Sequence, residues 1–153
     1  MSERSDVPPR LTIDTNHIVS GVISPGNYSS RLLRMWQEGR IHWVQTSHTF
    51  HELQEVLRRE RFRIKYGFQE REIAELLETI AIGAEFVTAL PISELPLHSR
   101  DTKDDKFLAC ALGGDCDYLI TEDEDLLVLN GQQELGTLQI LTASDFLKQT
   151  GRL

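Results

Sequence analysis

Acidic side chains are concentrated in one short stretch of the chain, residues 101–125, and this stretch constrains what the chain can fold into. Nine carboxylates lie there with only two lysines, Lys103 and Lys106, around an apolar run at 107–112 and a strand-like run at 118–120. Carboxylates gathered at the ends of core elements repel one another, so a fold that tolerates them usually contains a positive charge that holds them together. The pattern therefore favours a bound divalent metal ion.

Length and composition indicate a single domain. The chain has 153 residues, 40% of them hydrophobic, which suffices for one well-filled core and is too short for two ordinary domains. We expect a disordered N-terminal extension at 1–9, one folded domain at 10–148 and a C-terminal tail at 149–153.

The sequence carries no sign of export or membrane insertion. No apolar run approaches the roughly 20 residues that span a bilayer, and the polar start with two prolines is unlike a signal peptide. Cys110 lies in an apolar helix pattern and Cys116 follows it closely, which suits buried thiols better than a zinc site or a disulfide framework. We therefore expect a cytoplasmic protein in a reducing setting, with no membrane partner.

Charge is unevenly distributed along the chain. A formal net charge of −8 argues against binding phosphate backbones through bulk electrostatics, because such binding rests on lysine and arginine. Residues 58–65 are nevertheless strongly basic, with aromatic residues interleaved at 62, 66 and 68. This block could contact RNA by charge and stacking, or it could be a solvated helix end whose aromatics are core. Its candidate RNA contacts are Arg58, Arg59, Arg61, Arg63 and Lys65.

Strand-like and helix-like patterns alternate. Strands are expected at 11–13, 41–44, 85–87, 118–120 and 138–141. Helices are expected around 32–36, after a cap at Ser47, and at 69–82, 105–112, 125–129 and 143–149. The residue pair Thr15-Asn16 is typical of a turn. This alternation predicts an α/β fold with a twisted, mostly parallel five-stranded sheet and helices on both faces.

Four acids fall where such a fold would place a site. In an open parallel sheet, sites form outside the carboxyl ends of the strands. Asp14 follows the first strand, Asp123 follows the fourth, and Asp104 begins the helix before the fourth. Glu52, early in the helix after the second strand, would face the same crevice. These hard oxygen ligands suit one or two Mg²⁺ or Mn²⁺ ions, which also bind substrate phosphate.

The motifs that contain these acids resemble the PIN domain, in the branch of toxins from toxin–antitoxin systems akin to VapC. The resemblance covers about residues 10 to 148 and rests on four segments in the right order, at 13–16, 50–57, 100–109 and 117–127. It implies a PIN-like nuclease domain and a metal-dependent ribonuclease that hydrolyses RNA as the toxin of a prokaryotic toxin–antitoxin pair. The partners that it implies are an inhibitory antitoxin and a second copy of the chain in a homodimer. The implied catalytic and metal-binding acids are Asp14, Glu52, Asp104 and Asp123.

Other positions follow from the same resemblance. Asn16 and Thr121 match polar positions that support the site in that family, and Asp105 and Asp125 are reserve metal ligands. The Asp104-Asp105 pair leaves the third ligand open, and the spacing to the helix that follows favours Asp104. His17 departs from the pattern, because the family usually has an apolar residue there.

Two other functions stay open from the sequence. An aspartate-nucleophile phosphatase also places an acid after its first strand, but it normally needs a second aspartate two residues later, where this chain has Asn16. A non-catalytic module that binds RNA or protein on the same scaffold is the other alternative. Any single acid could also be a helix cap or a turn residue.

Overall fold

The sheet has five parallel strands in the order β3-β2-β1-β4-β5. The computed structural model describes residues 7–151, so most of the predicted N-terminal extension and the last two residues of the tail lie outside the described part. Within that part, the α/β fold and the parallel sheet predicted from the sequence are confirmed. The strands are β1 (Arg10–Ile13), β2 (His42–Gln45), β3 (Glu85–Phe86), β4 (Tyr118–Ile120) and β5 (Gln139–Leu141).

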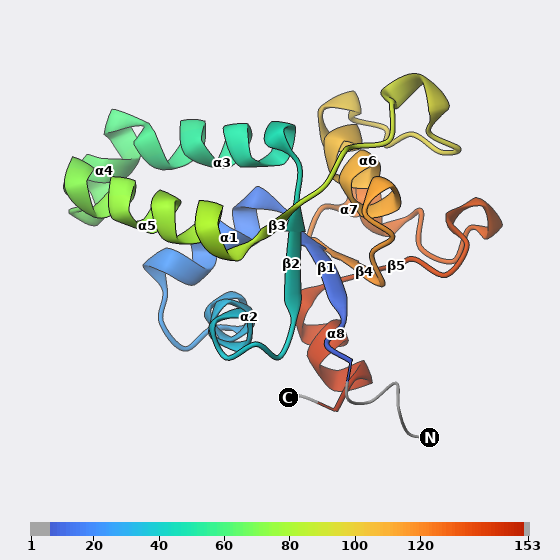
Figure 1. The fold of residues 1–153 in the computed structure, drawn as a ribbon, viewed down its shortest axis with the longest axis horizontal. Helices are drawn as coiled ribbons and strands as arrows, with labels where there is room; N and C mark the ends of the chain where they lie inside the picture. The colour runs from blue at the N-terminus through green and yellow to red at the C-terminus, as the bar shows by residue number, and fades with distance from the viewer. Residues whose placement is uncertain (1–6, 152–153) are drawn as a thin grey trace.

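Helices cover both faces of the sheet, as predicted. In Figure 1, α1, α2, α3 and α5 gather on one side of the strands, and α6 and α7 lie on the other. None of the helices in the described residues is both long and apolar enough to span a bilayer. The helices are α1 (Thr15–Ile23), α2 (Tyr28–Gln37), α3 (Ser47–Arg58), α4 (Glu60–Tyr66), α5 (Glu70–Gly83), α6 (Asp105–Gly113), α7 (Glu124–Leu127) and α8 (Ala143–Gln149).

The strands bury side chains on both faces, which divides the core into two clusters. Leu11 and Ile13 of β1 belong to the cluster beneath α1, α2, α3, α5 and α8. Leu119 of β4 points to the opposite cluster, around α6 and α7. The Thr12 side chain points to the same cluster as Leu119, because its hydroxyl lies 3.3 Å from the sulfur of Cys110. Both cysteines are free and buried, as expected from their pattern.

The connection after β1 differs from the prediction. Thr15 and Asn16 do not form a turn, because α1 begins directly after Asp14. The Asp14 side chain caps this helix by accepting a hydrogen bond from the Asn16 backbone N–H. Polar residues after a strand suit a turn and a helix cap equally well, and the burial of Ile18 in the core selects the helix. Asp14 is thereby fixed at the junction of a strand and a helix.

The cap of α3 also differs from the prediction. Thr46 caps this helix in place of Ser47, because its side chain and that of Thr49 exchange hydrogen bonds with each other's backbone N–H. This reciprocal capping fixes the start of α3 at the carboxyl end of β2, and hence the position of Glu52.

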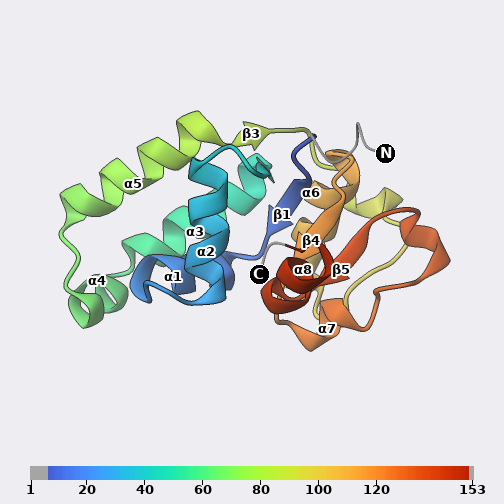
Figure 2. The ribbon, with the colours of Figure 1, turned by 90° about the horizontal axis from the view of Figure 1, so that it is seen from below.

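The basic block lies on an arm that extends away from the sheet. Both views show α4 at the outer end of the α3–α5 pair (Figures 1 and 2). Phe62 is buried and stacks on Phe68 with 5.7 Å between ring centroids, and it also contacts Tyr66. The interleaved aromatics therefore pack the arm together. Of the five basic residues only Arg63 is half-buried, and the other four are exposed.

Candidate active site

Asp14 is held at the carboxyl end of β1 by two hydrogen bonds. Its Oδ2 accepts from the Thr121 hydroxyl at 2.8 Å, and its Oδ1 accepts from the Asn16 N–H at 3.1 Å. The side chain is only 6% exposed, and this burial raises its pKa, an effect that the two hydrogen bonds partly oppose. The nearby charge of Glu52 raises it further. The fold therefore fixes a carboxylate where its charged form is disfavoured.

Thr121 connects Asp14 to Asp123 across two neighbouring strands. Its hydroxyl donates to Asp14 and accepts a hydrogen bond from the Asp123 N–H at 3.0 Å, and the side chain is fully buried directly after β4. Because β1 and β4 pair in parallel, their carboxyl ends lie side by side and bring these residues together. Asn16 supports Asp14 through its backbone N–H, and its own side chain is exposed.

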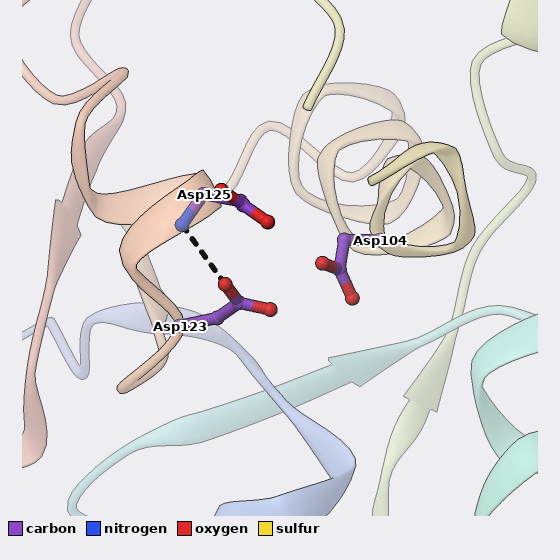
Figure 3. A group of neighbouring side chains, drawn as sticks. All are labelled: Asp104, Asp123 and Asp125. Atoms are coloured by element: carbon purple, nitrogen blue, oxygen red, sulfur yellow. Dashed lines mark hydrogen bonds between the residues drawn. The ribbon is translucent and has the colours of Figure 1, made fainter. Parts of the chain in front are cut away.

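Three carboxylates form what we call the acidic group: Asp104, Asp123 and Asp125. Each offers one oxygen, and these oxygens lie within 4.8 Å of one another. Figure 3 shows Asp104 facing Asp123 and Asp125 from the turn that precedes α6, while the other two come from the start of α7. Asp123 also caps that helix by accepting a hydrogen bond from the Asp125 N–H at 2.9 Å.

Asp104 is the most perturbed member of the acidic group. Burial, followed by the neighbouring Asp123 carboxylate, raises the pKa of Asp104 to about 7, and Asp14 adds to this effect. Its Oδ2 atom is buried and has no hydrogen-bond partner. A buried acceptor without a partner costs about 1–3 kcal/mol, and more when it is charged. The geometry thus leaves one oxygen in need of a positively charged or proton-donating partner.

A divalent cation fits this arrangement. The acidic group offers carboxylate oxygens only, which are the ligands that Mg²⁺ and Mn²⁺ prefer, and it contains no thiolate or imidazole. A cation there would give Asp104 Oδ2 a partner and would offset the repulsion among the three charges. Asp104, Asp123 and Asp125 could hold such an ion, with Asp14 close enough to influence the pKa of Asp104.

Glu52 lies beside Asp14 but outside the acidic group. Its Oε1 accepts a hydrogen bond from Lys106 Nζ at 2.5 Å, and its Oε2 accepts one from the Thr15 hydroxyl at 2.5 Å. The lysine compensates the glutamate charge. Sequence reasoning missed this role of Lys106, because the two residues are 54 positions apart and no local pattern connects them.

Asp105 is turned away from the acidic group. It is 2% exposed, its Oδ1 accepts from the Ser99 N–H at 2.7 Å, and its Oδ2 lies 2.9 Å from His98 Nδ1. Both oxygens therefore hold the loop before α6. Of the adjacent pair at 104–105, the structure brings Asp104 to the other acids. Asp125, the second reserve ligand, is in the group and also forms an ion pair with Arg100 at 3.3 Å.

Comparison with known proteins assigns the family. Residues 10–125, most of the chain, match the sequence model of the PIN domain. The chain belongs to the PIN domain family. PIN domains are generally nucleases, and the predicted family is confirmed at this level, although the match does not extend to the toxin branch.

The fold is also similar to the crystal structure of PAE2754 from Pyrobaculum aerophilum. That similarity has a TM-score of 0.57 and 11% sequence identity, and it covers 99% of this chain and 94% of the other. At such low identity it supports the fold alone. No curated protein sequence matches the chain significantly.

We predict that the metal-free PIN domain loses stability as the pH rises from about 4 to about 7. An unfolded aspartate has a pKa of about 3.9, and the folded-state pKa of Asp104 is raised to about 7. Between these two pH values, Asp104 keeps its proton in the folded state and loses it in the unfolded state. Raising the pH therefore favours unfolding. Asp104→Asn cannot ionise and should show a flatter pH dependence. Urea midpoints of chelator-treated protein test this, and parallel pH profiles for both proteins would contradict it.

Proposed function

We propose that this PIN domain is a Mg²⁺- or Mn²⁺-dependent endoribonuclease. The observation that carries the proposal is the acidic group at the carboxyl edge of the sheet, with its buried and unpartnered Asp104 oxygen. Family membership supports a nuclease. The charge of the site supports a cation, because RNA phosphate would otherwise be repelled by the carboxylates.

In this proposal, Asp104, Asp123 and Asp125 bind one or two ions, and Asp14 completes the site. A bound ion of this kind polarises the scissile phosphate and lowers the pKa of a coordinated water. Thr121 keeps Asp14 and Asp123 in register through its two hydrogen bonds. Glu52 is held by Lys106 and acts on the site from its edge, directly or through water.

RNA would be held by the basic residues of the outer arm, Arg58, Arg59, Arg61, Arg63 and Lys65. Arg58 lies six residues beyond Glu52 on α3, which corresponds to about 9 Å along the helix. A strand of RNA can bridge that separation. These side chains would supply phosphate contacts on a chain whose net charge is −8.

The finer biological role rests on the motif resemblance. We propose that the protein is the toxin of a prokaryotic toxin–antitoxin pair, acting in the cytoplasm as a homodimer and inhibited by a cognate antitoxin. The alternative of an aspartate-nucleophile phosphatase has less support. Both oxygens of Asp14 accept hydrogen bonds and the side chain is almost fully buried, an arrangement poorly suited to attack on a phosphate.

We predict that the protein cleaves mixed cellular RNA in the presence of Mn²⁺. Asp123→Asn should slow cleavage roughly a hundredfold or more, because losses of this size are typical when one electrostatic contribution to catalysis is removed. Asp145→Asn is the matched control, because Asp145 is an exposed acid in the first turn of α8. Metal-activated water should leave a 5′-phosphate and a 3′-hydroxyl. RNA that is bound but left intact would contradict the nuclease proposal, and a 2′,3′-cyclic phosphate would contradict the proposed chemistry.

A metal-binding prediction is independent of activity. A ligand that binds only the folded state at a hundredfold excess over its Kd stabilises it by about 2.7 kcal/mol. Mn²⁺ should therefore raise the melting temperature by about 5 °C or more. Asp104→Asn should lose most of this rise, and Asp145→Asn should keep it. Equal rises in both variants, measured by thermal unfolding, would place the bound ion elsewhere.

A further inference from the structure

A small pocket lies next to the segments that carry Asp14 and Asp123, at the N-terminal turns of α1, α2 and α8. Its volume is about 230 Å³. We call it the His17 pocket, and the residues used below are His17, Ser20, Asn27, Tyr28, Ser144 and Glu122. The pocket borders the candidate active site on two sides. The backbone N–H of His17 donates to the carbonyl oxygen of Asp14 at 3.0 Å, and Glu122 immediately precedes Asp123.

His17 is a buried polar side chain whose second ring nitrogen, Nε2, is approached only by an exposed carboxylate among the described residues. It is 7% exposed, and its Nδ1 lies 2.7 Å from the hydroxyl oxygen of Ser29. Its Nε2 is buried and makes no hydrogen bond. The carboxylate of Glu122 lies 3.4 Å from Nε2, on a side chain that is 65% exposed. An apolar residue would fill this position without leaving a ring nitrogen unpaired, so the histidine has a use beyond packing.

The lining of the pocket indicates the class of ligand. It combines the hydroxyl of Ser144 and the imidazole of His17 with an Asn27 amide that already bonds to the Ser20 hydroxyl and to the Ser30 N–H. It includes no lysine or arginine. Phosphate sites are usually built from those cations, and here the one charged group is Glu122, so the lining disfavours an anion. Mixed donors and acceptors suit a neutral group with a polar edge.

Size and exposure narrow the ligand further. Typical small-molecule pockets measure about 300–1,000 Å³, so about 230 Å³ suits a single ring system. Tyr28 lines the pocket while remaining 44% exposed, which leaves an aromatic face available. Unpaired RNA bases are recognised by stacking on aromatic side chains and by hydrogen bonds to their edges.

We propose that the His17 pocket binds one unpaired nucleobase of the RNA whose backbone crosses the acidic group. The base stacks on Tyr28 and its edge bonds to His17 Nε2, from which the Glu122 carboxylate turns away. This inference rests on the proposed function for the identity of the substrate. It makes the position of cleavage depend on the base that enters the pocket.

Binding of the four uncharged ribonucleosides to the metal-free protein tests the proposal without cleavage. At millimolar concentration, at least one nucleoside should shift the NMR signals of the His17 ring, and inorganic phosphate should not. Tyr28→Ala should weaken that binding about fivefold or more, the loss expected when one base loses its stacking partner. His17→Gln should change which nucleoside binds best. Phe86→Ala is the matched control, because Phe86 is a 42% exposed aromatic residue on the edge strand β3 and does not line the pocket, and it should leave the affinity unchanged.

Three results would overturn the proposal: no nucleoside shifts the His17 signals, phosphate alone shifts them, or Tyr28→Ala and Phe86→Ala bind equally. The outcome is separable from that of the nuclease assay. Nucleoside binding by a protein that leaves RNA intact would support the pocket and contradict the nuclease. RNA cleavage without nucleoside binding would support the nuclease proposal and contradict the proposed role of the pocket.

Discussion

Repulsion among carboxylates at one edge of the sheet is the constraint on which the rest of the site depends. The strand order places β1 beside β4, so Asp14 and Asp123 lie at the same edge of the sheet, where Thr121 bonds to both. The turn before α6 adds Asp104 to the same place, and its pKa is raised as a result. A fold that gathers these groups must pair them, protonate them or bind a cation.

The structure resolves this repulsion differently at the edge of the site and at its centre. Three acids have a nitrogen partner from a side chain: Glu52 has Lys106, Asp105 has His98, and Asp125 of the acidic group has Arg100. Among the described residues, the inner acids Asp14, Asp104 and Asp123 have no such ion pair. Asp14 has hydrogen bonds alone, and Asp104 keeps an oxygen without a partner. The uncompensated charge is thus confined to the place where an ion would bind.

Much of this arrangement could be predicted from the sequence, because the apolar run of a buried parallel strand shows where the strand ends. A strand buried on both faces is short and apolar, and an acid directly after it, such as Asp14, must lie at the carboxyl edge. The same argument predicted Asp123 after the fourth strand, whereas Asp104 was predicted from its place at the start of the helix before that strand. What failed depended on tertiary contacts: Thr15-Asn16 has turn chemistry, but the burial of Ile18 continues it as a helix.

Contacts between residues far apart in the chain could not be predicted from the sequence either. The contact of Lys106 with Glu52 joins two helices that no local pattern connects, and the role of Asp105 depends on a loop that folds back to it. His17 was visible as a departure from the family pattern. Its neighbours Ser29 and Tyr28 belong to α2, and no local sequence pattern connects that helix to His17.

The central claim is that a divalent cation relieves the repulsion within the acidic group. Anomalous diffraction from a crystal of the protein soaked in Mn²⁺ tests it most directly. The account predicts a manganese peak coordinated by Asp104 and Asp123, with Asp125 or Asp14 as a further ligand. Well-ordered carboxylates with no manganese between them, or manganese bound only elsewhere, would contradict it.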